Sequence, residues 1–246
     1  MKTLMIIYGT RPELIKLAPV IHALKALRGY NVIITNTSQH TELSADVRRT
    51  FQIDDDFCLD VLTARRTLNE LHGKLVIELE KVYRQTQPDA VIVHGDTSTA
   101  LAAALAAFHM NIKIAHVEAG LRTGNLKAPW PEEMNRRAIS LVAQYHFAPT
   151  KTAQKILLQE NHPDTSIVIT GNTVIDALLA TSKKLDENPA FMHQAAKQIK
   201  QAGYTFGHNN ILLVTAHRRQ NFGRELQHIC QALAYIAESF PDMHLV

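Results

Sequence analysis

Short apolar runs alternate along this chain with longer segments in which apolar residues recur at helical spacing. Most of the short runs are apolar throughout, which is typical of strands that are covered on both faces. We expect strands at 4–8, 31–35, 90–93, 112–117, 145–148, 167–170 and 211–215. We expect helices at 12–27, 41–51, 67–85, 98–108, 132–143, 150–160, 174–185, 190–201 and 224–239.

This repeated order of strand and helix predicts an α/β fold, a doubly wound, Rossmann-like parallel sheet with right-handed crossovers. The composition changes at a charged segment, 182–189, and again at 203–210. We therefore expect a first domain at 1–185, a linker with a helix at 186–209, and the start of a second α/β domain at 210–246. One strand, one helix and the opening of another strand cannot close a sheet, so we expect this second domain to be incomplete, that is, truncated.

Composition excludes several classes of protein. The chain has 246 residues, of which 46% are hydrophobic and 20% charged, and its net charge is +3, so it is not a disordered chain. It has no apolar run of about 18 residues, the length of a membrane-spanning helix, so we expect no membrane partner. Basic residues are dispersed and aromatic residues make up 6%, which disfavours a nucleic-acid groove but fits arginines facing a small phosphorylated ligand. Cys58 and Cys230 fit no metal-binding or redox spacing, so we expect a reduced, cytoplasmic protein without a metal site.

Candidate chemistry lies in the loops after the strands, because ligands of a doubly wound sheet bind at the carboxyl ends of its strands. The first loop has the sequence GTRPE at 9–13, with Lys16 further along. A capping box of Thr10 and Glu13, with a proline in the first helical turn, explains part of this loop. It does not explain Arg11 or Lys16, and two cations beside a helix N-terminus make an anion site. The chain has neither a dinucleotide-binding glycine motif nor a P-loop.

Three further loops carry acidic residues. Asp96 lies in the sequence HGDT, where it or Thr97 can also cap the next helix. Glu118 directly follows an apolar strand, where a carboxylate is costly unless it is used or paired. Glu132 begins a helix and is spaced to pair with Arg136 at i,i+4. Each residue alone has a structural explanation, but three acidic loops on one rim of a parallel sheet favour a binding site.

The second domain's strand is followed by His217, Arg218 and Arg219, and this group between a strand end and a helix start favours a diphosphate contact. Taken together, the chain closely resembles one family, the non-hydrolysing UDP-N-acetylglucosamine 2-epimerases. Seven motifs carry the resemblance, in the family's order: GTRPE-x-IK (9–16), QH (39–40), HGDT (94–97), HVEAGLRTG (116–124), PWPEE-x-NR (129–136), GNTVID (171–176) and HRR-x-NFG (217–223).

This resemblance implies a two-domain, glycosyltransferase-B-like fold that binds a nucleotide sugar between its domains. It implies reversible interconversion of UDP-N-acetylglucosamine and UDP-N-acetylmannosamine, by elimination of UDP and its return with C2 inverted. No metal or redox cofactor is implied. The product would supply N-acetylmannosamine-type sugars for cell-surface polysaccharide, and the full-length protein is expected to be a homodimer.

The resemblance also implies roles for individual residues. The implied catalytic residues are Asp96, Glu118, Glu132 and His217, the last of which can instead bind the diphosphate. The implied substrate-binding residues are Arg11, Lys16, Arg136 and Arg218. Bacterial members also bind a second UDP-N-acetylglucosamine as an activator, and the residues that match this region are Gln39, His40 and Arg65, with Arg218 beside them.

Departures from the family pattern leave alternatives open. Ala216 and Gln220 stand where the family commonly has glycine and glutamate, and Thr41 replaces a common arginine. The family's later segments, which hold uridine and ribose, have no counterpart among these residues. An inactive truncated remnant, a partial UDP-sugar-binding module and a hydrolysing 2-epimerase of the same fold are therefore alternatives, whereas the complete set of carboxylates disfavours a glycosyltransferase.

Overall fold

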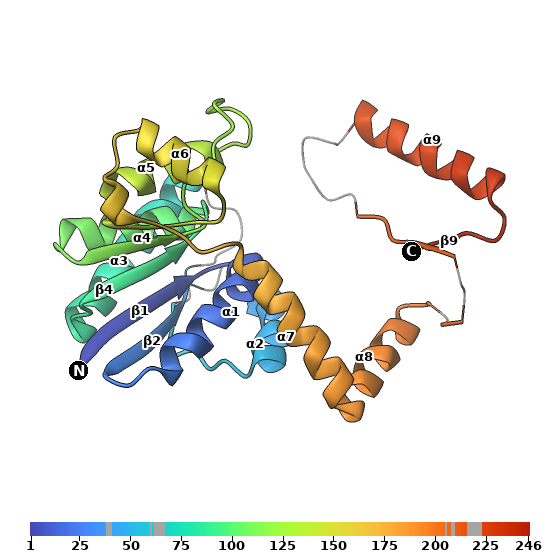
Figure 1. Cartoon of the computed structure of the whole chain (residues 1–246), viewed down its shortest axis with the longest axis horizontal. Helices are drawn as coiled ribbons and strands as arrows, with labels where there is room; N and C mark the ends of the chain where they lie inside the picture. The colour runs from blue at the N-terminus through green and yellow to red at the C-terminus, as the bar shows by residue number, and fades with distance from the viewer. Residues whose placement is uncertain (38–40, 60, 62–66, 205, 208–209, 216–222) are drawn as a thin grey trace. The chain divides into compact units, whose positions relative to one another are not determined.

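The computed structural model describes residues 1–37, 41–59, 61, 67–204, 206–207, 210–215 and 223–246 (Figure 1). The chain divides into two compact units, Met1–Thr181 and Ser182–Val246. No helix in the described ranges is long and apolar enough to cross a membrane.

The first unit is built on a seven-stranded sheet in the order β3-β2-β1-β4-β5-β6-β7, and every pair of neighbouring strands is parallel. The strands are β1 (Lys2–Tyr8), β2 (Tyr30–Asn36), β3 (Phe57–Cys58), β4 (Ala90–His94), β5 (Lys113–Val117), β6 (Tyr145–Ala148) and β7 (Ile167–Ile169). This confirms the predicted doubly wound α/β fold. Only β3 was not expected, because two residues are too short to show a pattern.

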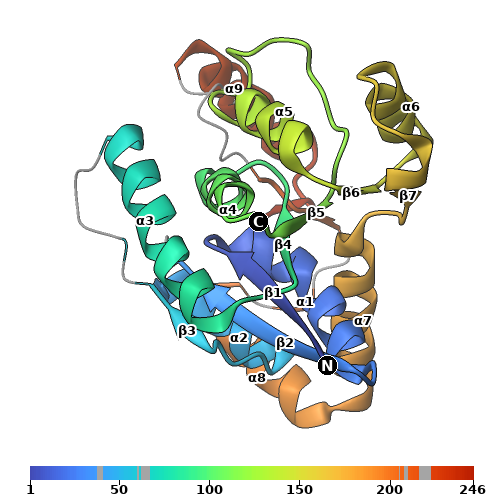
Figure 2. The same ribbon diagram turned by 90° about the vertical axis from the view of Figure 1, so that its left-hand side faces the viewer.

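Helices cover both faces of this sheet (Figure 2). They are α1 (Arg11–Ala26), α2 (Thr41–Phe51), α3 (Leu68–Thr86), α4 (Ser98–His109), α5 (Glu132–Val142), α6 (Lys151–Gln159) and α7 (Thr173–Glu187), with a short 3-10 helix at Asp164–Ser166. Threonine hydroxyls cap the N-termini of four of them, at Thr10, Thr67, Thr97 and Thr150. Such caps satisfy backbone N–H groups that have no partner within the helix.

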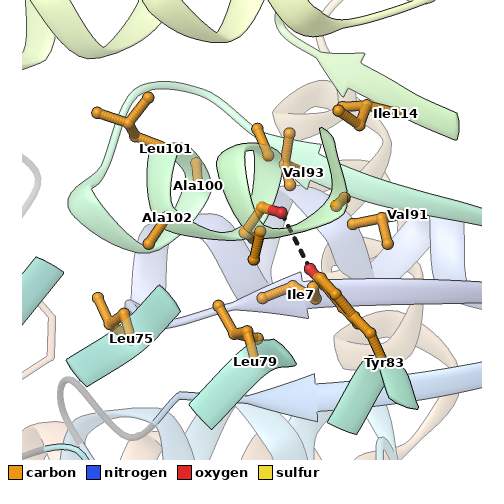
Figure 3. Packing of buried hydrophobic residues seen from close by; sticks show 14 of the residues in the cluster. Ile7, Leu75, Leu79, Tyr83, Val91, Val93, Ala100, Leu101, Ala102 and Ile114 are labelled. Carbon is orange, nitrogen blue, oxygen red and sulfur yellow. Dashed lines mark hydrogen bonds between the residues drawn. The ribbon is translucent and has the colours of Figure 1, made fainter. Parts of the chain in front are cut away.

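The side chains of the continuous apolar strands contribute to two hydrophobic cores, one on each face of the sheet. On β1, Met5 and Ile7 join a cluster with α3 and α4, whereas Ile6 and Tyr8 join a cluster with α1. In the first cluster the Tyr83 hydroxyl donates a hydrogen bond to the carbonyl of Ala103 at 3.0 Å (Figure 3). Most alanines of α4 are buried in the same cluster, where that helix packs against the sheet.

The centre of the sheet is where its winding reverses. Strands β1 and β4 are neighbours, and the chain runs outward from them in opposite directions. In open α/β sheets, ligands bind at this switch point, outside the carboxyl ends of the two strands. The β1–α1 and β4–α4 loops, which carry the predicted site residues, flank it.

The second unit contains α8 (Pro189–Gln201), β8 (Ile211–Leu212), α9 (Arg224–Ser239) and β9 (His244–Leu245), and α7 crosses into it from the first unit. Strands β8 and β9 pair in parallel. The strand expected at 211–215 is therefore shorter than predicted, and the strand whose opening was expected at the end of the chain is present.

Candidate functional site

A buried carboxylate holds the loop between β1 and α1. Thr10 caps α1, and its hydroxyl accepts a hydrogen bond from the backbone N–H of Glu13 at 3.5 Å, as predicted. Glu13 is buried, with only 2% of the residue exposed. Its carboxylate accepts hydrogen bonds from the Gly9 N–H at 3.0 Å, the Thr10 hydroxyl at 2.8 Å and the Thr97 hydroxyl at 2.7 Å. Burial raises the pKa of the Glu13 carboxyl, and these hydrogen bonds oppose the shift.

Gly9 lies where the loops approach one another most closely. A Cβ atom at this position would fall 2.2 Å from the Thr99 Oγ1 and 2.5 Å from the Thr37 Oγ1. These two buried hydroxyls are hydrogen-bonded to each other at 2.9 Å. Only glycine fits between them, so the first residue of the GTRPE sequence is required by packing.

Asp96 in the β4–α4 loop pairs with α5. Arg136 forms an ion pair with the Asp96 carboxylate, and a second Arg136 nitrogen lies 3.6 Å from Glu133 Oε2. The Asn135 side chain donates to the backbone carbonyl of Asp96 at 2.8 Å. The predicted i,i+4 pair of Arg136 with Glu132 is wrong, because the guanidinium turns toward Asp96 and Glu133 instead.

The pKa of the Asp96 carboxyl is raised above its ordinary value. Burial is the largest cause, the Arg136 guanidinium opposes it, and the negative charges of Glu132 and Glu118 add to it. The three predicted catalytic carboxylates are therefore close enough to influence one another, although they lie in three different loops.

Glu118 occupies a strained position at the end of β5. Its φ of 64° lies in the left-handed region, which costs a non-glycine residue about 1 kcal/mol or more. Both of its carboxylate oxygens accept hydrogen bonds from Lys16 Nζ, at 2.9 and 2.7 Å, and Oε2 also accepts one from Asn172 Nδ2 at 3.2 Å. The carboxylate is thus paired, as its place after an apolar strand requires. His94 Nε2 lies 3.9 Å from the same oxygen.

Three buried polar atoms at this rim have no hydrogen-bond partner in the described part of the chain. They are His94 Nε2, Glu132 Oε2 and Arg136 Nε. Burial, with the Lys16 charge beside it, lowers the pKa of His94 to about 3, so its ring is neutral at pH 7. Buried polar atoms in folded proteins are nearly always paired, so three such atoms in one place indicate that a polar ligand or water completes them.

Neighbouring residues fix the loops in which the site residues lie. The buried Glu133 accepts hydrogen bonds from the backbone N–H groups of Thr123 at 3.0 Å and Gly124 at 3.2 Å. Arg122 binds both carboxylate oxygens of Glu160, at 2.9 and 2.7 Å. Sequence reasoning missed the functions of Glu133 and Asn172, although both lie within the quoted motifs.

The structure thus brings together Lys16, Asp96, Glu118, Glu132 and Arg136 at the carboxyl end of the central strands. Arg11 lies exposed in the first turn of α1, at its N-terminus. The remaining predicted site residues lie outside the described residues: Gln39, His40, Arg65, His217 and Arg218. Among the residues that are described, no three His, Cys, Asp or Glu side chains are grouped to hold a metal ion.

Comparison with known proteins agrees with this arrangement. A family model described as UDP-N-acetylglucosamine 2-epimerase matches residues 22–246. The chain belongs to this family. A protein of Ralstonia nicotianae described as a probable UDP-N-acetylglucosamine 2-epimerase is 44% identical over 246 residues, which are 100% of this chain and 65% of that protein. The chain therefore spans about two thirds of the length of the curated relative.

Solved structures of the family have the same fold. The UDP-N-acetylglucosamine 2-epimerase of Neisseria meningitidis, bound to UDP-N-acetylglucosamine, is 40% identical with a TM-score of 0.91 over 100% of this chain and 65% of its own. The Methanocaldococcus jannaschii enzyme, in complex with UDP-N-acetylglucosamine and UDP, is 32% identical with a TM-score of 0.82 over 100% of this chain and 66% of its own. These likenesses confirm the predicted glycosyltransferase-B-like class of fold.

Proposed function

We propose that the protein containing this chain interconverts UDP-N-acetylglucosamine and UDP-N-acetylmannosamine by inverting C2 of the sugar. The family supports the reaction class, and relatives with solved structures bind this nucleotide sugar and UDP. The observation that carries the proposal is the grouping of Asp96, Glu118 and Glu132 with Lys16 and Arg136, next to three unpartnered buried polar atoms.

The chemistry requires both cations and carboxylates. The C2 hydrogen is not adjacent to a carbonyl group, so it is not acidic by itself. Its removal becomes feasible when the C1–O bond breaks and the electron pair leaves with UDP, so that a C1=C2 double bond forms. Cations must then hold the departing diphosphate, and a carboxylate must take the proton. Arg11 at the N-terminus of α1 and Lys16 one turn further along are suited to the first task.

Inversion requires the proton to return to the opposite face of C2 while a diphosphate oxygen attacks C1. This needs a second group that can donate a proton. Carboxylates in different environments can divide these tasks, because burial and neighbouring charges move their pKa values apart. The raised pKa of Asp96 suits a group that carries a proton during part of the cycle. Glu118 is held by its ion pair with Lys16.

Turnover in deuterated water tests this proposal. The complete gene product is incubated with UDP-N-acetylglucosamine, and proton NMR follows the anomeric signals and the C2 hydrogen. We expect UDP-N-acetylmannosamine to appear and deuterium to enter C2 of both sugars.

The other outcomes are distinct. Free N-acetylmannosamine with UDP would identify a hydrolysing 2-epimerase and overturn the proposal. Binding of UDP-N-acetylglucosamine with no product and no deuterium at C2 would identify a binding module, as one of the alternatives foresees. Glu80→Gln, an exposed change on α3 in an i,i+4 pair with Arg84, is the control and should react as the wild type does.

A further inference from the structure

We propose that Glu13 is a positioning residue that ties the β1–α1 loop to the β4–α4 loop, so that Arg11 and Asp96 face one ligand. The proposal rests on the function proposed above, because it assigns those two residues to the same substrate. Glu13 itself is not placed against the reacting atoms.

The tie crosses the switch point of the sheet. Oε2 of Glu13 accepts from the Gly9 N–H and the Thr10 hydroxyl, both in its own loop. Oε1 accepts from the hydroxyl of Thr97, which is 84 residues further along and lies in the loop after β4. Strands β1 and β4 are neighbours at the point where the sheet's winding reverses, so this one carboxylate connects the two loops that flank the expected ligand position.

Capping alone does not account for the burial of Glu13. On α3, Thr67 and Glu70 form a complete capping box on the exposed surface, with hydrogen bonds of 2.8, 3.1 and 3.2 Å. A carboxylate at a helix start can therefore act as a cap while it stays in contact with water, without the free-energy cost of desolvation. Glu13 carries that cost, since it is 2% exposed and its pKa is raised by burial. In this buried position the Glu13 carboxylate reaches an additional partner, the hydroxyl of Thr97.

The tie fixes the residue next to it in the β4–α4 loop. The Thr97 hydroxyl donates to Glu13 and accepts from the backbone N–H of Ala100 at 3.0 Å, so both its rotamer and its hydrogen are set. Asp96 precedes Thr97 directly, and its backbone carbonyl is held by Asn135. The backbone that carries the Asp96 carboxylate is therefore held at its own carbonyl and at the residue that follows it.

Two variants distinguish the hydrogen bonds that Glu13 makes between the two loops from the negative charge of its carboxylate. In Glu13→Ala, all three donors lose their acceptor. In Glu13→Gln, the amide oxygen can accept from the Gly9 N–H while the amide nitrogen donates to Thr97, whose hydroxyl then turns away. The alanine variant breaks the tie, and the glutamine variant keeps most of it without a charge. Glu70→Ala removes the equivalent carboxylate from the capping box of α3 and serves as the matched control.

Amide hydrogen exchange of the 246-residue chain measures the tie directly. In Glu13→Ala we expect the amides of Gly9 and of residues 95–97 to exchange at least about 10-fold faster, because the local opening that exposes them becomes easier. Amides of β5 should keep their rates, and Glu13→Gln should stay within about 3-fold of the wild type throughout. Glu70→Ala should change only the start of α3. Unchanged rates at Gly9 and 95–97 in Glu13→Ala would overturn the proposal.

Turnover of the complete gene product measures the consequence. Glu13→Ala should lower kcat per folded molecule about 30- to 100-fold, because small misplacements of reacting groups cost this much. Glu13→Gln should recover most of that loss. A purely structural role would instead reduce the folded fraction, read by circular dichroism at the assay temperature, and leave kcat per folded molecule unchanged, which would refute positioning. If the wild type does not turn over, the proposed function fails, and the exchange rates still decide whether the tie exists.

Discussion

Lys16 in the second turn of α1 donates hydrogen bonds to both carboxylate oxygens of Glu118, 102 residues later in the chain. The side chains are 24% and 13% exposed, so neither charge is fully hydrated. The pair joins the helix after β1 to the loop after β5 across β4. Under the proposed function, a diphosphate bound by Lys16 would compete with Glu118 for the same ammonium group.

The first prediction concerns the strength of this pair. In a double-mutant cycle of Lys16→Met and Glu118→Gln, we expect a coupling of about 1–3 kcal/mol in the free energy of unfolding, since partial burial limits screening by solvent. Urea unfolding of the four proteins measures it. The exposed pair Lys81 and Glu78 is the control, and the same cycle there should give less than about 0.5 kcal/mol. Equal couplings at the two sites would show that the Lys16 pair is no more than a surface contact.

The second prediction concerns the carboxylate of Glu118. Glu118→Gln preserves the shape of the side chain and the unusual backbone conformation can be kept, so the protein should fold normally. Turnover by the complete gene product should fall by about 10²- to 10⁴-fold, the range for loss of a general acid or base. Circular dichroism and turnover are measured on the same samples. Wild-type turnover in a folded variant would restrict Glu118 to a structural role.

The third prediction concerns Arg11. Its guanidinium lies exposed at the N-terminus of α1, where the helix dipole also favours an anion. Arg11→Ala should weaken UDP binding by about 1.5–3 kcal/mol, or about 10- to 150-fold in Kd, for loss of a charge-assisted contact. Titration calorimetry of the complete gene product measures it. Arg28→Ala, beyond the opposite end of the same helix, is the control, and an equal effect of both changes would point to general charge rather than a site.

Much of the fold follows from local pattern. Continuous apolar strands predicted a sheet covered on both faces, and the alternate assignment of Met5 and Ile6 to two cores confirms it. The capping-box pattern predicted the cap at Thr10, and of the two residues expected to cap α4, Asp96 or Thr97, the structure has Thr97. Strand β3 had no such signal, because its two residues are defined by their pairing with β2 rather than by their own pattern.

The sequence predicted which residues lie in the site, but not which of them pair with one another. Loops at strand ends identified Asp96 and Glu118 as candidates, since the topology brings such loops to one rim. The partner of a charge depends on geometry across the sheet, so the pairing of Lys16 with Glu118 had no sequence signal. Glu13 was interpreted only as part of a capping box with Thr10, and the sequence of a capping box does not show whether its carboxylate is buried.

The last prediction concerns acid stability. His94 and His116 are buried, and desolvation is the largest cause that lowers the pKa of each from 6.5 to about 3. Below pH 6.5 the unfolded chain binds protons at these positions while the folded protein does not, so stability falls as the pH drops from 6.5 toward 3. Each histidine should contribute a loss of about 2 kcal/mol between pH 7 and pH 5. The raised pKa values of Glu13 and Asp96 act in the opposite direction, because there the folded protein holds the proton more tightly.

A comparison with a variant isolates the histidine effect, since the carboxyl groups are common to both proteins. His116→Gln keeps a donor for the carbonyl of Gly95, which the His116 ring contacts at 2.7 Å, but it cannot bind a proton in the unfolded state. The stability difference between the two proteins should therefore shift by about 2 kcal/mol in favour of the variant from pH 7 to pH 5, by urea unfolding at several pH values. His109→Gln, at an exposed position at the end of α4, should show no such shift relative to the wild type. Parallel curves for wild type and His116→Gln would mean that His116 gains its proton in the folded protein as readily as in the unfolded chain, which its complete burial opposes.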